Sequence, residues 1–342
     1  MLQQGPPGVV HVRFFDKDAK RKDRTLRFLM FVGILTCIWS SILKWRQELA
    51  SADSCENFIT FANIGQHGRL GNQLFQVAST IGIAEANGLP WLFPAIISST
   101  SVGKLFGLAG SDKIDTANCV ELVEEKKTFY QPQIPRTQAC RPVSLMGYFQ
   151  NLQYFENSST VRDKFRVLPE IKLTVENAVP EVLLENSVTM HVRRGDYVGL
   201  SNMFQLMSKE YYLEALDHIQ HIDALIIVSD DVEWCKEQFS YLNQTNVVFS
   251  PFADELLDFV LISLGRHIII ANSTFSWWAA YLKGVHASPA RAGVIVAPDV
   301  WYREDGPLSH LNRVSFFPET WTLVSSKQHV ALAVPAEPID PA

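Results

Sequence analysis

Two adjacent arginines followed by an aspartate form the most reactive-looking stretch of the chain. Arg193, Arg194 and Asp196 lie within residues 191–197 (HVRRGDY), directly after an apolar run. A planar guanidinium group can bind a phosphate through two parallel hydrogen bonds. Because neighbouring side chains of an extended chain point to opposite sides, one arginine is predicted to bind a phosphate while the other pairs within the protein. Asp196 would orient an arginine or act on a substrate hydroxyl; the alternative is a purely structural Arg–Asp network.

A second stretch, residues 272–278 (NSTFSWW), places hydroxyl groups at the predicted start of a helix. Free N–H groups and the helix dipole make such a terminus suitable for a phosphate. Ser273, Thr274, Phe275 and Ser276 are therefore candidate ligand-binding residues. The alternative is that these residues cap the helix and that the two tryptophans fill the core.

Two aspartates, Asp230 and Asp231, follow another predicted strand. A carboxylate here can accept hydrogen bonds from the N1–H and 2-amino groups of guanine. Capping of the helix that begins at Val232 is the alternative, and spacing alone favours it. The D-x-E pattern formed by Asp231 and Glu233 is a weak match to a divalent-metal site.

A glycine-rich turn in the first half contains Arg69, which follows Gly68, and Asn72, which follows Gly71. Glycine permits a close approach of the backbone to a ligand, and Arg69 would reach across a cleft. The alternative is a tight turn that ends in a helix cap.

The elements that position these residues alternate regularly in the second half. Strands are predicted at 188–192, 224–228, 247–249, 267–271 and 294–297, and helices at 209–220, 232–239, 254–264 and 274–282. This alternation predicts a parallel sheet covered on both faces. Ligands of such sheets bind beyond the carboxyl ends of the strands, which here means the loops after Val192, Val228, Phe249 and Ala271.

The first half is less regular. It predicts a strand over 58–63, a helix over 73–87 capped by Gly88, and short strands at 91–93 and 145–149. Residues 98–142 are expected to be irregular.

The N-terminal region predicts a membrane anchor. Residues 28–43 contain no charged side chain, and Leu26 and the stem of Arg27 extend the run toward a membrane-spanning length. Nine of the 30 Lys and Arg residues lie within residues 1–46, mostly before this run. We therefore expect a cytosolic tail (1–25), a spanning segment (26–43), a stem (44–57) and a lumenal body in the Golgi. A cleaved signal peptide and a buried helix are the alternatives.

The acidic body argues against nucleic acid as a partner, because nucleic-acid binding requires a basic surface. A lumenal body would accept glycans at Asn157 and Asn243, and a third sequon begins at Asn272 inside the NSTFSWW stretch. None of the five cysteines has zinc-site spacing, and the four in the body allow one or two disulfides in three full pairings.

Five motifs in order resemble the galactoside alpha-1,2-fucosyltransferase family, which is glycosyltransferase family 11-like. They are GRLGNQ (68–73), GYFQ (147–150), HVRRGDY (191–197), WCK (234–236) and NSTFSWW (272–278), and the resemblance covers about residues 58–320. It implies an α/β, GT-B-like enzyme with an acceptor-side lobe (58–185), a GDP-fucose-binding lobe (186–325) and a disordered tail (326–342). It also implies no metal or other cofactor, and a galactose-terminated glycan as acceptor.

The resemblance implies roles for single residues as well. His191 would lie near guanine, Asp230 or Asp231 would read the base, and Ser273 to Ser276 would line the phosphates. Arg193, with Arg194 in the same donor-binding group, would hold the diphosphate, while Arg69 and Asn72 would face the reacting centre. Asp196 is the candidate base. A protein O-fucosyltransferase and a non-catalytic nucleotide- or sugar-binding protein are the alternatives.

Overall fold

The computed structural model describes Trp39 and residues 57–124, 132–134, 141–240, 242, 246–312 and 316–326. The predicted tail, spanning segment and stem lie outside these residues except for Trp39 and Asn57, as does the C-terminal tail except for Ser326. Within the described part, no helix combines the length and apolar character needed to cross a membrane. The chain divides into two compact units, Met1–Cys55 and Glu56–Ala342, and the second contains all the elements below.

A six-stranded parallel sheet forms the centre of the second half, which confirms the predicted strand alternation. Its order is β6-β5-β4-β7-β8-β9, with β4 (Ser187–Val192), β5 (Ala224–Ser229), β6 (Asn246–Phe249), β7 (His267–Ile269), β8 (Ile295–Pro298) and β9 (Thr322–Val324). The expectation that residues 294–297 end the series was wrong, because β9 pairs with β8. A three-residue strand carries too little periodicity to be distinguished from a loop.

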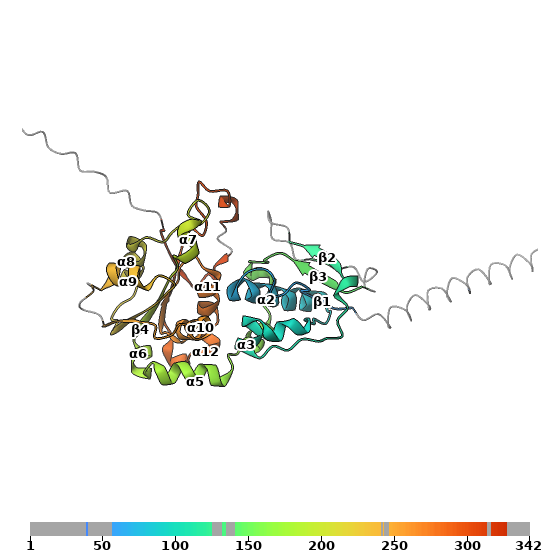
Figure 1. Ribbon diagram of the computed structural model, residues 1–342, viewed down its shortest axis with the longest axis horizontal. Coiled ribbons are helices and arrows are strands. Elements are labelled where there is room, and N and C mark those ends of the chain that lie inside the picture. The colour runs from blue at the N-terminus through green and yellow to red at the C-terminus, as the bar shows by residue number, and fades with distance from the viewer. Residues whose placement is uncertain are drawn as a thin grey trace, which may run out of the picture. The chain divides into compact units, whose positions relative to one another are not determined.

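Helices cover both faces of this sheet, so all six residues of β4 are buried. Val188, Met190 and Val192 pack in the cluster that contains α8 (Lys209–Asp217) and α9 (Val232–Phe239). The opposite face is covered by α10 (Glu255–Leu264), α11 (Thr274–Tyr281) and α12 (Lys283–His286), on the side that faces α2 (Leu70–Asn87) in Figure 1. The short helix α7 (Gly195–Gly199) follows β4 directly.

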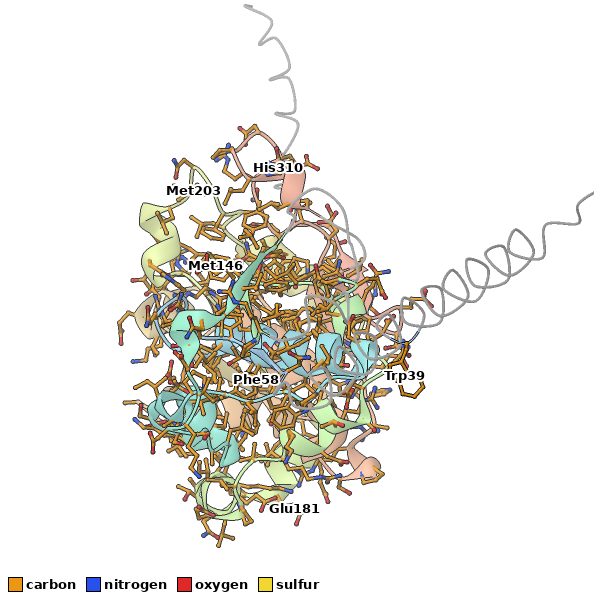
Figure 2. The ribbon with its side chains drawn as sticks, turned by 90° about the vertical axis from the view of Figure 1, so that its right-hand side faces the viewer. Trp39, Phe58, Met146, Glu181, Met203 and His310 are labelled. Atoms are coloured by element: carbon orange, nitrogen blue, oxygen red, sulfur yellow. The ribbon has the colours of Figure 1, made fainter. Side chains whose placement is uncertain are left out.

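Two helices within the predicted first lobe also pack against this half. They are α5 (Pro169–Ala178), which contacts α10, and α6 (Glu181–Glu185), which contacts β4. Glu181 forms an ion pair with Arg291 (3.0 Å) and lies at the end of the second unit opposite Met203 and His310 (Figure 2). The division of the body at residues 185 and 186 stays a prediction.

A smaller parallel sheet of order β1-β3-β2 lies in the first half. It consists of β1 (Ile59–Thr60), β2 (Val120–Val123) and β3 (Val143–Met146), flanked by α2, α3 (Ser101–Phe106) and α4 (Ser159–Lys164). Gly88 ends α2 in the left-handed conformation (φ 63°), as predicted. Residues 91–93 form only an isolated bridge, from Trp91 to Ile59. The region expected to be irregular contains α3 and β2.

The two halves meet where α2 packs against α11. The ring of Phe75, fully buried, lies 4.7 Å from the ring of Trp277 and 5.1 Å from that of Trp278, between centroids. The tryptophans of the NSTFSWW stretch therefore fill the core, as the structural alternative predicted. Their burial fixes the start of α11 relative to α2.

Candidate active site

A cavity of about 660 Å³ opens at the carboxyl ends of the strands of the larger sheet. Its wall includes residues from the segments after β4, β5, β6 and β7, the loops at which the sequence predicts a ligand. The turn before α2 supplies the remaining wall. Residues lining this donor cavity, as we call it, include Gly68, Arg69, Asn72, His191, Arg193, Asp196, Tyr197, Asp230, Phe252, Asp258, Ser273, Thr274 and Phe275.

A chain of ion pairs crosses the mouth of the donor cavity. Arg193 Nη1 lies 2.7 Å from Asp230 Oδ2, and Arg193 Nη2 donates to Asp196 Oδ1. Arg69 Nη2, from the other half, lies 2.6 Å from Asp196 Oδ2. Arg69 is 66% exposed while Arg193 is only 16% exposed. The site thus holds one fixed and one reorientable guanidinium group, both available to an anion that competes with Asp196.

Arg194 points away from the cavity, as the alternation of side chains predicted. Its Nε lies 3.1 Å from Asp231 Oδ2, and its guanidinium carbon lies 4.2 Å from the centre of the Trp234 ring. Asp231 Oδ1 accepts a hydrogen bond from Trp234 N (3.2 Å) and so caps α9. Arg194 and Asp231 therefore do not line the donor cavity, which corrects their expected place. The capping alternative is the observed role of Asp231.

Asp230 lines the cavity, but the protein already engages both of its carboxylate oxygens. Oδ2 pairs with Arg193, and Oδ1 accepts a hydrogen bond from Arg194 N (2.8 Å). A Cβ atom at Gly195 would lie 2.4 Å from Asp230 Oδ2, so only glycine lets the loop approach this closely. These contacts make Asp230 a positioning residue for Arg193.

The start of α11 contributes Ser273, Thr274 and Phe275 to the cavity. Ser273 occupies the N-cap position without a side-chain capping bond. Ser276 was expected to line the phosphates, but it is fully buried and its hydroxyl contacts the carbonyl oxygens of Ala271 (3.4 Å) and Ser273 (3.3 Å). Successive helical residues turn by about 100°, so four consecutive side chains cannot share one face.

His191 presents a neutral imidazole to the site. Burial, with a smaller contribution from the charge of Arg193, lowers the pKa of His191 to about 3. Its Nδ1 is buried and has no hydrogen-bond partner among the described residues. Its ring lies beside that of Phe275, at 5.4 Å between centroids. A buried polar atom without a partner in the wall of a cavity is available to a ligand.

Asn72 joins the two halves at the edge of the cavity. Its Oδ1 accepts hydrogen bonds from Thr274 Oγ1 (3.1 Å) and from Gln150 Nε2 (2.8 Å). A Cβ atom at the preceding Gly71 would lie 2.4 Å from the carbonyl carbon of Thr274. Gly71 therefore permits the close approach of α2 to the backbone of α11. The sequence had predicted that the glycines of this turn approach a ligand.

Sequence reasoning missed Asp258, a carboxyl group that lines the donor cavity from α10. Its Oδ1 accepts a hydrogen bond from Ser250 Oγ (2.5 Å). Burial, and secondarily the charge of Asp254, raises the pKa of Asp258 to about 6. A lone carboxylate within the apolar run 256–264, just after a strand end, is the signal that could have revealed it.

We expect Asp258→Asn to change how stability depends on pH. The native pKa of this acid lies above its ordinary value of 3.8, so the native state holds the extra proton and loses stability as pH rises from about 4 to 6. The asparagine variant lacks this loss, so its melting temperature relative to wild type should increase across that window and then level. Thermal melts from pH 4 to 8 measure it, with the exposed Asp217→Asn as control. Curves of identical shape for wild type and Asp258→Asn would contradict the assignment.

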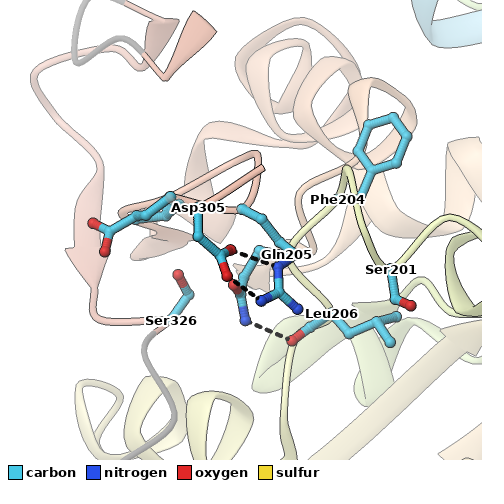
Figure 3. Close-up of a pocket in the computed structure, with 9 residues that line it drawn as sticks. Ser201, Phe204, Gln205, Leu206, Asp305 and Ser326 are labelled. Carbon is cyan, nitrogen blue, oxygen red and sulfur yellow. Dashed lines mark hydrogen bonds and ion pairs between the residues drawn. The ribbon is translucent and has the colours of Figure 1, made fainter. Parts of the chain in front are cut away.

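Other candidate features do not add to this site. A neighbouring hollow contains Arg303, whose guanidinium group is occupied by two hydrogen bonds from its Nε and Nη2 to Asp305 (2.7 and 2.6 Å; Figure 3). Within the described residues, no group of three or more His, Cys, Asp or Glu side chains could hold a metal ion. Asn157 is exposed and Asn272 is buried, with its Nδ2 donating to backbone carbonyls, whereas Asn243 lies outside the described residues.

The fold and the cavity define an α/β protein of parallel sheets whose binding loops meet at the strand ends, with two arginines facing an enclosed space. The sequence model of Glycosyl transferase family 11 matches residues 34–307. The chain therefore belongs to glycosyl transferase family 11.

Two named relatives are similar to this chain over roughly half to two thirds of its length. An Escherichia coli alpha-1,2-colitosyltransferase is 30% identical over 53% of this chain and 62% of its own length. Galactoside 2-alpha-L-fucosyltransferase SEC1 from Bos taurus is 27% identical over 65% of this chain and 64% of its own length. The matches thus span less than two thirds of each relative.

Among solved structures, POFUT1 in complex with GDP-fucose is similar with a TM-score of 0.43 and 13% identity, covering 70% of this chain and 97% of that one. The fucosyltransferase NodZ from Bradyrhizobium has a TM-score of 0.41 and 14% identity, covering 66% and 93%.

Proposed function

We propose that the protein transfers L-fucose from GDP-β-L-fucose to the 2-hydroxyl of a terminal β-galactose, forming an alpha-1,2 linkage with inversion. The observation that carries this proposal is Arg193, held beside the start of α11 in a cavity at the strand ends of a family 11 chain. The names of the bacterial and animal relatives share the alpha-1,2 linkage. The animal relatives are named for fucose, and the two parallel sheets fit a GT-B-like arrangement.

The diphosphate of the donor would bind between Arg193 and the first turn of α11. Amides of a first helical turn have no partner within the helix, and they face the part of the cavity formed by Ser273, Thr274 and Phe275. As the bond to the leaving GDP lengthens, negative charge accumulates on its β-phosphate. A preorganised guanidinium group stabilises that charge, and this kind of term is often the largest in catalysis. Arg69 would close on the same group from the other half.

Asp196 would act after the donor binds. In the structure both of its oxygens accept hydrogen bonds from guanidinium groups, of Arg193 and of Arg69. A diphosphate that takes over these donors leaves the carboxylate free to accept the proton of the acceptor hydroxyl while the new C–O bond forms. General-base assistance of this kind contributes roughly 10²–10⁴ in rate.

His191 and Asp258 are the groups left to read the base. His191 and Asp258 both line the donor cavity, whereas Asp231 does not line it and each oxygen of Asp230 already holds one contact within the protein. We therefore assign guanine recognition to Asp258 in place of the two aspartates expected from the sequence.

We further propose that the body works in the Golgi lumen behind a single span at 26–43. The support is the uncharged run at 28–43 and the cluster of basic residues before it, which stays cytosolic in most membrane proteins. A protease-protection assay in sealed microsomes tests this topology. We expect the body to be protected from the protease and the N-terminus to be cleaved.

Release of GDP by the full chain, solubilised in detergent and assayed in EDTA, tests the activity. We expect release from GDP-fucose that depends on lactose, with an alpha-1,2 linkage in the product. A GDP-colitose arm tests the donor named by the bacterial relative. Tight GDP binding without transfer to any β-galactoside would overturn the proposal. Transfer to a folded protein domain would then identify a protein O-fucosyltransferase, and the absence of turnover would identify a binding protein.

A further inference from the structure

A second cavity, of about 390 Å³, adjoins the donor cavity. The two share four lining residues: Asn72, Tyr197, Phe204 and Thr274. These residues surround the place where a donor sugar attached to the diphosphate would project. A ligand in the second cavity would therefore lie next to the reacting carbon.

The second cavity suits a neutral ligand. None of the described residues that line it is basic, and two of them, Glu124 and Asp299, are carboxylates. A diphosphate placed here would meet negative charge without a compensating cation. Aromatic rings dominate the wall, among them Tyr148, Trp301 and Tyr302. Aromatic faces combined with a few fixed polar groups are typical of sites that bind the apolar face of a sugar ring and orient its hydroxyls.

Most polar side chains that line this cavity already form hydrogen bonds within the protein. Asn312 Oδ1 accepts hydrogen bonds from Trp301 N (3.0 Å) and Tyr302 N (2.8 Å). Asp299 Oδ1 accepts hydrogen bonds from the backbone and hydroxyl of Ser326 (2.8 and 2.9 Å). Neither oxygen is available to fix the position of a ligand.

Glu124, like Asp299, uses only one of its carboxylate oxygens, but Glu124 is half-buried whereas Asp299 is exposed. Its Oε2 accepts hydrogen bonds from Tyr148 N and Phe149 N, both at 2.9 Å, whereas Oε1 accepts none from the described residues. Glu124 and Tyr302 both line the cavity, and the charge of Glu124, after burial, contributes to raising the pKa of Tyr302 to about 12.

The backbone that binds the Glu124 carboxylate has an unusual conformation. Gly147 has φ 146° and Phe149 has φ 50°, and positive φ is unfavourable for a residue other than glycine. A Cβ atom at Gly147 would lie 2.8 Å from Glu124 Oε2. The GYFQ motif therefore forms a socket for one carboxylate, while its Gln150 reaches Asn72 at the border of the donor cavity.

We propose that the second cavity is the acceptor site and that Glu124 orients a hydroxyl group of a neutral, galactose-type sugar through its free oxygen. This inference rests on the proposed transfer to a β-galactoside. Glutamine at this position can satisfy the two amides with its carbonyl oxygen, which leaves a donor where the sugar hydroxyl requires an acceptor.

The test compares Glu124→Gln with Glu121→Gln in the full chain. Glu121 is an exposed residue of β2, the strand that ends just before Glu124, and does not line the cavity. Loss of a hydrogen bond to a charged group corresponds to a roughly 10- to 100-fold change, so the KM for lactose should rise by about that factor in Glu124→Gln alone. The affinity for GDP and the release of GDP without acceptor should stay at the wild-type values.

An unchanged KM, or a fall in kcat alone, would overturn the role of Glu124. Should Glu124→Gln fail to fold, Tyr148→Ala at the 45% exposed rim residue should raise the KM for lactose and leave GDP affinity unchanged. If the wild type transfers fucose to no β-galactoside, lactose included, the proposed function fails by itself. Saturation-transfer NMR of lactose with the GDP-loaded chain then decides: a signal in wild type that Glu124→Gln abolishes supports the site, and no wild-type signal rejects it.

Discussion

Replacing Arg193 by alanine is expected to lower the rate of sugar transfer by a factor of about 10²–10³, the typical cost of one preorganised donor at a developing charge. The structure gives the reason. Arg193 is largely buried at the carboxyl end of β4 and is held by Asp230 and Asp196, so it needs little reorganisation when the leaving diphosphate becomes more negative. The same replacement should weaken GDP binding less than it slows transfer, because catalysis depends on the difference between the two states.

Steady-state kinetics with GDP-fucose and lactose, beside GDP affinity by calorimetry, measure this difference. Arg303→Ala is the matched control, because Arg303 is a paired arginine outside the donor cavity. Arg193→Lys keeps the charge without the planar fork and should retain only part of the lost rate. A folded Arg193→Ala protein with wild-type kcat would exclude a role for Arg193 at the leaving group.

Gly71→Ala should destabilise the fold and weaken donor binding together. The added Cβ would lie 2.4 Å from Thr274 C and 2.5 Å from Phe275 N, distances at which backbone has to move. Overpacking of a tight site typically costs about 1–3 kcal/mol, and these neighbours are backbone atoms that yield less than side chains. Since Thr274 and Phe275 line the donor cavity, their displacement should also raise the Kd for GDP.

Urea unfolding and GDP titration measure the two effects. Gly284→Ala in α12 is the control, because a Cβ atom there meets nothing within 4 Å. Alanine exceeds glycine in helix propensity, so the control should keep or gain about 0.5–1 kcal/mol. Equal free energies of unfolding for Gly71→Ala and the control would show that α2 does not pack closely against α11 in solution.

The elements that the sequence predicted well are those with long or repeated patterns. The helix from 232 to 239 has the predicted bounds. The helix α2 was predicted because its apolar residues recur at helical spacing over most of its 18 positions, and its end was predicted because Gly88 follows it. By contrast, β2 and α3 lie in a region rich in polar residues, where the apolar residues do not recur with a clear helix or strand period. Their existence depends on pairing with β3 and packing on α2, which are contacts distant in sequence.

The candidate site follows the same division. The opposite directions of Arg193 and Arg194 were predicted from the alternation of side chains along an extended chain, although both residues follow the last residue of β4. Ser276 was misplaced because a helix rotates its side chains away from a common face. Glu124 carries no local signal, since its role arises from a backbone socket, whereas the isolation of Asp258 in an apolar run is a signal whose meaning depends on burial beside distant strands.

The bridge from Thr274 through Asn72 to Gln150 has a thermodynamic consequence. It forms a shared border of two cavities, and Asn72 and Thr274 line both. A ligand that tightens this border from one side changes the affinity on the other, and linkage requires the change to be equal in both directions. Under the proposed function, any change that a bound nucleotide makes to the affinity for the sugar equals the change that the sugar makes to the affinity for the nucleotide, and Asn72 lies at the border where such a coupling would act.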